Sequence, residues 1–123
     1  MWADFMPLKI KRVYDPPSGD DGARILVDRL WPRGLSKEKA QLALWLREVA
    51  PSNELRKWFG HEPEKWPEFR RRFQAEIKAN PTAFARLTEQ VKQGPATLVY
   101  AAADQEHNNA RVLAELLGKK LKR

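Results

Sequence analysis

Residues 28–34 bring several chemically useful side chains together: a carboxylate, two guanidinium groups and an indole. Arg29 and Arg33 could each form two parallel hydrogen bonds with a phosphate or a carboxylate, and Trp31 offers a flat face for stacking. A proline and a glycine in the same stretch limit its conformational freedom. The loop is therefore predicted to bind a small anionic molecule.

The carboxylate of this loop, Asp28, leaves more than one role open. It could form an internal ion pair with Arg29 or another arginine, because buried arginine–carboxylate pairs often serve structure. It could equally act as an acid or base in a hydrolase or transferase, a role that His61 could also fill because histidine titrates near neutrality. Either catalytic role requires the side chain to lie in a cleft with room for a substrate.

A second polar segment, residues 103–109, opens the last predicted helix. Asp104 could cap that helix, and Asn108 carries a side-chain amide near its start. Free backbone N–H groups and the positive end of the helix dipole favour an anion at such a place. Capping alone also explains Asp104, so this segment is predicted to join the ligand site only if it faces Arg33.

The elements that must position these segments are short, buried strands. Residues 24–28 and 97–102 contain continuous apolar runs, which are typical of strands covered on both faces, and residues 8–14 predict a further strand. In open α/β sheets, ligands bind beyond the carboxyl ends of the strands. Because segments 28–34 and 103–109 both follow such ends, we expect them to flank a common site.

Apolar periodicity predicts helices around residues 52–60, 66–77, 80–94 and 112–117. Leucines alternate at positions 42, 44 and 46, which fits a strand or a helix equally well. The breaker-rich residues 15–22 predict a flexible connection. Strands mixed with helices predict the α/β class, as a single layered domain over residues 1–123 with a small, mostly parallel sheet flanked by helices.

The composition limits the possible functions. A net charge of +7 favours anionic partners, although part of it lies in the terminal residues 118–123. The absence of cysteine excludes disulfides and thiolate chemistry, and two widely separated histidines predict no tight metal site. No glycine pattern for a nucleotide cofactor is present. No apolar run approaches the ~20 residues needed to cross a bilayer, and residues 1–6 make no signal-peptide core; we therefore expect a cytoplasmic protein with no membrane partner.

Non-specific nucleic-acid binding is a further alternative, because Arg70, Arg71 and Arg72 form a basic run. A solvated helix face is the ordinary explanation of such a run. Binding would require the run, the lysine-rich C-terminus and the Trp31 loop to share one face. Nothing in the sequence indicates a helix-turn-helix, so sequence-specific DNA recognition is not predicted.

The chain also resembles a known family. The matching stretches are residues 11–16, 22–34, 50–52, 54–57 and 98–102, together with Asn108. Through them the chain is similar to the YeaO-like family of bacterial proteins, domain of unknown function 488, and the string from residue 27 to 34 is the most specific part. The resemblance implies a cytoplasmic single-domain protein and no particular activity. It directs attention to Arg12, Tyr14, Arg24, Asp28, Arg29, Trp31, Arg33 and Asn108.

Overall fold

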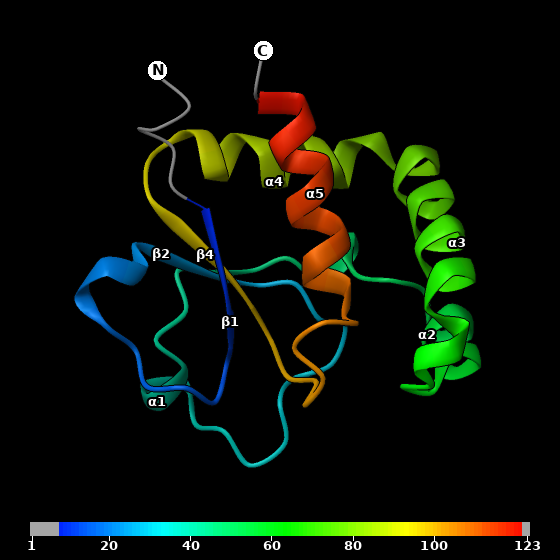
Figure 1. Cartoon of the computed structure of the whole chain (residues 1–123). Helices are drawn as coiled ribbons and strands as arrows, with labels where there is room; N and C mark the ends of the chain where they lie inside the picture. Colours follow the sequence, from blue (N-terminus) through cyan, green and yellow to red (C-terminus); the bar gives the residue numbers. More distant parts are fainter. Residues whose placement is uncertain (1–7, 122–123) are drawn as a thin grey trace.

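Four parallel strands form the sheet of the molecule (Figure 1). The computed structural model describes residues 8–121, so residues 1–6, discussed above for a signal peptide, lie outside the described part. The strands are β1 (Leu8–Arg12), β2 (Ala23–Leu26), β3 (Leu44–Trp45) and β4 (Ala96–Tyr100). Their spatial order is β1-β4-β2-β3, and each neighbouring pair runs parallel. The predicted parallel sheet is confirmed.

The two central strands, β2 and β4, are apolar because both of their faces are covered. Ile25 pairs with Leu98 and Leu26 pairs with Val99, and all four side chains are fully buried. Successive residues of a strand point to opposite faces. Ile25 and Leu98 accordingly belong to the large core beneath the helices, whereas Leu26 and Val99 belong to a smaller cluster.

Helices cover one face of the sheet. They are α2 (Asn53–Phe59), α3 (Trp66–Ala79), α4 (Pro81–Lys92) and α5 (Asn109–Leu121), while the single turn α1 (Lys37–Ala40) lies apart from them at the lower left of Figure 1. Helix α5 packs on β1 and β4, and α3 packs on α4 and α5. The apolar stripe predicted for α3 is buried at Phe69, Phe73 and Ile77. This arrangement confirms the α/β class.

Capping residues explain where α2 begins and ends, whereas α4 begins without a side-chain cap. Ser52 caps α2, because its hydroxyl accepts a hydrogen bond from Leu55 N at 3.1 Å, and Gly60 ends that helix with φ of 55°. Asn80 precedes α4, but its side-chain amide donates to Glu48 O at 3.3 Å and does not cap the helix. The Asn80 side chain thus makes a tertiary hydrogen bond to Glu48 instead of capping its own helix.

Irregular chain covers the second face of the sheet. Trp31, Leu35, Leu42 and Trp45 pack against the smaller apolar cluster that contains Leu26. Within this layer β3 pairs with β2, so part of the segment that the sequence left open between strand and helix is a short strand. The packing matters for function because the predicted ligand loop, residues 28–34, belongs to this layer.

Gly22 is required where the chain enters β2. Its φ is 65° and its ψ is −141°, and a Cβ atom there would lie 2.2 Å from Pro95 O. We expect Gly22→Ala to lower the free energy of unfolding by at least about 1–3 kcal/mol, the usual cost of a strained backbone, with the clash in addition. Urea denaturation measures this, with Gly19→Ala as the control, because a Cβ at Gly19 meets nothing within 4 Å. Equal midpoints for the two variants would contradict the assignment.

The parallel sheet determines where a site can form. Because all four strands point the same way, the residues that follow β1, β2 and β4 emerge at one edge of the sheet. These are the segments that the sequence singled out. Among residues 8–121, no helix combines the length and the apolar character needed to cross a bilayer.

Candidate functional site

A cavity of about 720 Å³ opens at the carboxyl ends of β1, β2 and β4. Its walls come from the segments after these strands, from the region of α2 and from α3. The lining residues are Arg12, Tyr14, Asp28, Arg29, Leu30, Trp31, Pro32, Arg33, Pro51, Arg56, Phe59, His61, Phe69, Ala101, Ala102, Ala103, Asp104, His107, Asn108 and Asn109. The volume lies within the range of small-molecule sites, about 300–1,000 Å³.

Most residues singled out from the sequence line this cavity. They are Arg12, Tyr14, Asp28, Arg29, Trp31, Arg33, His61 and Asn108. The fold thus gathers groups that are up to 96 positions apart in the chain (108 minus 12). Arg24 is the exception and does not line the cavity.

Arg12 is the last residue of β1, and backbone carbonyl groups hold its guanidinium group in place. Its Nε donates to Ala102 O at 2.9 Å, and its Nη2 donates to Ala101 O at 3.0 Å. Its guanidinium carbon also lies 5.1 Å from the centre of the Tyr14 ring, within cation–π range. These contacts hold the positive charge of Arg12 at the end of β4.

Arg29 is held in the same way at the entrance to α2. Its Nε donates to Pro51 O and its Nη2 donates to Ala50 O, both at 3.0 Å. Its partners are carbonyl groups, and no salt bridge joins Arg29 to Asp28 in the described part of the chain. The internal Asp28–Arg29 pair that the sequence allowed is therefore not formed.

The rest of the predicted loop is anchored on both sides. Trp31 Nε1 donates to Leu35 O at 2.7 Å, and the Trp31 ring packs edge-on against Trp45 with ring centres 5.4 Å apart. The hydroxyl of Tyr14 donates to Arg33 O at 2.8 Å. These contacts fix the backbone of the loop and leave the Arg33 side chain exposed at the cavity.

Asp28 joins the ends of three elements. Its Oδ2 accepts a hydrogen bond from Ala101 N at 2.8 Å, and its Oδ1 accepts one from Asn109 Nδ2 at 3.1 Å. The Asn109 amide also donates to Val27 O. Burial raises the pKa of the Asp28 carboxyl, although these hydrogen bonds and the nearby charges of His61 and Arg56 act in the opposite direction. A carboxyl group with a raised pKa in a cavity is typical of functional sites.

The segment before α5 forms a second polar wall. Asp104 Oδ2 lies 2.9 Å from His107 Nδ1, and this hydrogen bond lowers the pKa of the Asp104 carboxyl. The side chain of Asn108 is used internally, because it donates to Asp104 O and accepts from Arg111 N. Asn108 therefore shapes the wall of the cavity and caps α5.

One cavity residue, Arg56 of α2, was missed by reasoning from the sequence. Its Nη2 donates to Asn53 Oδ1 at 3.3 Å, but its Nε is buried without a hydrogen-bond partner in the structure of residues 8–121. Arg56 lies three positions before Phe59, an apolar residue that is buried in the core, and both line the cavity. This helical spacing was the available signal, since residues three apart share a helix face.

The cavity holds more positive than negative groups. Arg12, Arg29, Arg33 and Arg56 line it, and none of them forms an ion pair with a carboxylate of residues 8–121. Against them stand two carboxyl groups, those of Asp28 and Asp104. Four guanidinium groups against two carboxyl groups give the cavity a surplus of positive charge, which favours an anionic ligand.

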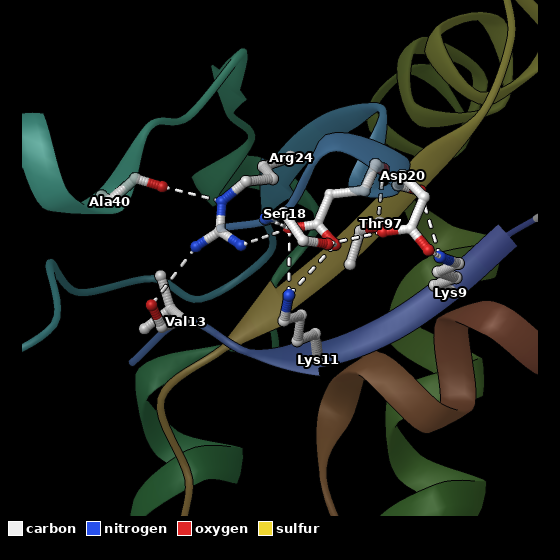
Figure 2. Close-up of polar contacts among 9 residues, drawn as sticks. Lys9, Lys11, Val13, Ser18, Asp20, Arg24, Ala40 and Thr97 are labelled. Carbon is white, nitrogen blue, oxygen red and sulfur yellow. Dashed lines mark hydrogen bonds and ion pairs between the residues drawn. The ribbon is translucent and has the colours of Figure 1, made fainter. Parts of the chain in front are cut away.

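Arg24 instead belongs to a buried ionic network on β2 (Figure 2). Its Nη1 lies 2.9 Å from Asp21 Oδ2, and its other nitrogens donate to Ala40 O and Val13 O. Asp21 is also paired with Lys11 at 3.1 Å. The connection over residues 15–22 was predicted to be flexible, yet its Asp21 is buried and held by the ion pairs with Arg24 and Lys11. The network explains Arg24 without a ligand.

The basic run on α3 is neutralised by acidic neighbours. Arg71 and Arg72 both pair with Glu68, and Arg70 pairs with Glu115 of α5. The Glu68–Arg72 pair has the spacing of four residues that brings side chains together on one helix face. These contacts favour the solvated-face explanation of the run.

Comparison with known proteins agrees with the sequence resemblance. The model of a family described as the inactive DUF488-N3 subclade matches residues 7–123. The uncharacterised protein YeaO of Escherichia coli (strain K12) is 45% identical over 112 residues, covering 91% of this chain and 97% of YeaO. The uncharacterised proteins Rv3073c of Mycobacterium tuberculosis (strain H37Rv) and Mb3100c of Mycobacterium bovis are each 40% identical over 110 residues, covering 89% of this chain and 92% of each relative. No solved structure gives a significant match. The chain belongs to the YeaO-like DUF488 family.

Proposed function

We propose that this protein binds a small phosphate- or carboxylate-bearing molecule in the cavity at the carboxyl end of the sheet, in the cytoplasm. The observation that carries the proposal is the set of four cavity arginines without a carboxylate partner among residues 8–121. Arg12 and Arg29 are already fixed by backbone carbonyls. An anion would meet preorganised guanidinium groups, so less free energy would be lost in ordering them.

Binding is favoured over turnover by two observations. The matched subclade is described as inactive. Both carboxylate oxygens of Asp28 already accept hydrogen bonds from the protein, so this side chain has a structural role in joining β2, β4 and α5. Asp28 and His61 nevertheless line the same cavity, so a hydrolase or transferase remains the second candidate. Non-specific nucleic-acid binding is less favoured, because the basic run on α3 is paired with acids.

A thermal-shift screen of phosphate- and carboxylate-bearing metabolites tests the proposal. A compound that stabilises the protein should bind Arg33→Ala about 10–100-fold more weakly, as expected for the loss of one or two charge-assisted hydrogen bonds. The matched control is Arg86→Ala, because Arg86 is exposed on α4 and outside the cavity lining. If Arg33→Ala binds the compound as tightly as the wild type does, the proposed site is wrong.

Anion affinity should rise as the pH falls. The raised pKa of Asp28 means that this carboxyl takes up a proton early on acidification, which removes a negative charge from the cavity. We expect sulfate, whose charge is constant in this range, to bind about three- to tenfold more tightly at pH 5 than at pH 8.

Calorimetric titration with sulfate at several pH values measures this dependence. Asp28→Asn carries no ionisable group at this position, so this variant should lose the increase in affinity at low pH. A pH-independent affinity, or one that rises with pH, would contradict the proposed charge balance.

A further inference from the structure

The cavity is much larger than an inorganic anion. Its volume of about 720 Å³ matches that of sites for organic ligands, whereas a phosphate or carboxylate group alone would fill a small part of it. A bound molecule must therefore carry a body in addition to its anionic group.

The remaining wall of the cavity is apolar and largely aromatic. Phe59 and Phe69 line it and stack on each other with ring centres 4.4 Å apart. Trp31 adds a third ring from the loop after β2, and Ala101 and Ala102 contribute small apolar side chains. Aromatic side chains pair with another ring in offset or edge-on geometry, and guanidinium planes stack on ring faces. The aromatic rings and the guanidinium groups of the cavity therefore both suit a ligand that contains a planar aromatic ring.

Two exposed apolar side chains support the same conclusion independently. Tyr14 and Leu30 are the large hydrophobic residues that stand exposed among residues 8–121, at 39% and 56%, and both line this cavity. Apolar surface gathered beside a cavity is typical of a ligand site. A ring in the cavity would remove such surface from water.

We propose that the ligand is an aryl anion, a planar aromatic ring that carries a phosphate or carboxylate group. The anionic group lies against the arginines, and the ring lies against Leu30 and the aromatic wall. This inference rests on the proposed function and deepens it, because it names the part of the ligand that the arginines do not bind.

Calorimetry with phosphate monoesters of equal charge tests the inference. Phenyl phosphate should bind about tenfold more tightly than methyl phosphate, which lacks the ring, and more tightly than cyclohexyl phosphate, whose ring is not planar. Benzoate, titrated alongside, distinguishes a carboxylate ligand from a phosphate ligand. Leu30→Ala should weaken phenyl phosphate binding several-fold, while Leu121→Ala, at the far end of α5 and outside the cavity lining, should not.

The outcomes separate the two proposals. Equal affinities for phenyl and methyl phosphate, or for phenyl and cyclohexyl phosphate, would overturn the aryl inference and leave anion binding standing. A failure of all four compounds, together with inorganic phosphate, to bind would overturn the proposed function itself.

Discussion

Replacing Asp21 with alanine should lower the free energy of unfolding by about 3–5 kcal/mol, the usual cost of removing one partner of a buried ion pair. The side chains of Asp21 and Arg24 are only 2% and 3% exposed. Without the carboxylate, the Arg24 charge would remain buried with carbonyl partners alone, and Lys11 would lose its acceptor as well. Urea denaturation at neutral pH measures the difference.

The control for this variant is Asp20→Ala. Asp20 is adjacent in the chain and pairs with Lys9, but its side chain is 77% exposed, so its removal should have little effect. An Asp21→Ala protein as stable as the Asp20→Ala protein would show that the network in Figure 2 does not stabilise the fold.

The buried Asp21–Arg24 ion pair also predicts how the free energy of unfolding changes with pH. Burial raises the pKa of Asp21, but hydrogen bonds from Ser18, Lys11 and Arg24 outweigh it and hold the pKa well below its ordinary range. A carboxyl group with a depressed pKa stabilises the fold above its unfolded pKa of about 3.9 and loses this contribution as the pH falls further. The stability gap between the wild type and Asp21→Asn should therefore be constant near neutrality and shrink below about pH 4. A gap that is unchanged at pH 2 would contradict this assignment.

Replacing Arg56 with methionine should abolish most anion binding without destabilising the protein. The buried Nε of Arg56 has no partner among residues 8–121, and an unsatisfied buried donor costs about 1–3 kcal/mol. Methionine is long, flexible and apolar, so it can fill the same space without that cost. The free energy of unfolding should stay constant or rise, while the affinity for phenyl phosphate should fall about 10–100-fold.

Denaturation and calorimetry on one preparation measure the two effects together, with Arg86→Met as the surface control. Opposite directions for stability and affinity are typical of a binding group that is held unpaired for its ligand. Arg56→Met that unfolds more easily yet binds phenyl phosphate normally would mean that Arg56 serves structure.

The sequence predicts the fold better than it predicts contacts between elements. Apolar runs indicated β2 and β4 because strands covered on both faces must be apolar throughout. The secondary structure of the alternating leucines near Leu44 could not be predicted. The strand β3 has only two residues, and it forms through pairing with β2, which is distant in the sequence. Where the periodicity was local, as in α3, its buried face was predicted correctly.

The candidate site shows the same division. The predicted strand ends indicated correctly which side chains gather around one cavity, since that follows from parallel topology. Arg24 was included because its type suits an anion, but alternation along β2 places it with Leu26 on the face away from the helices, where Asp21 meets it. Arg29 and Asp28 are adjacent in the chain and still bind different partners. Arg56 joins the cavity through the docking of α2, and its spacing of three residues from Phe59 was the local signal that it shares this helix face.

If the cavity arginines bind an anion, the side-chain N–H resonance of Arg56 should respond to that anion. Nitrogen-15-labelled protein is titrated with phenyl phosphate while the arginine Nε–H signals are followed, with Arg56→Met used to assign the peak. We expect a saturable shift of the Arg56 signal, because a bound anion changes the surroundings of a guanidinium group that lines the cavity. An Arg56 signal that stays in place while phenyl phosphate binds elsewhere, or does not bind at all, would contradict it.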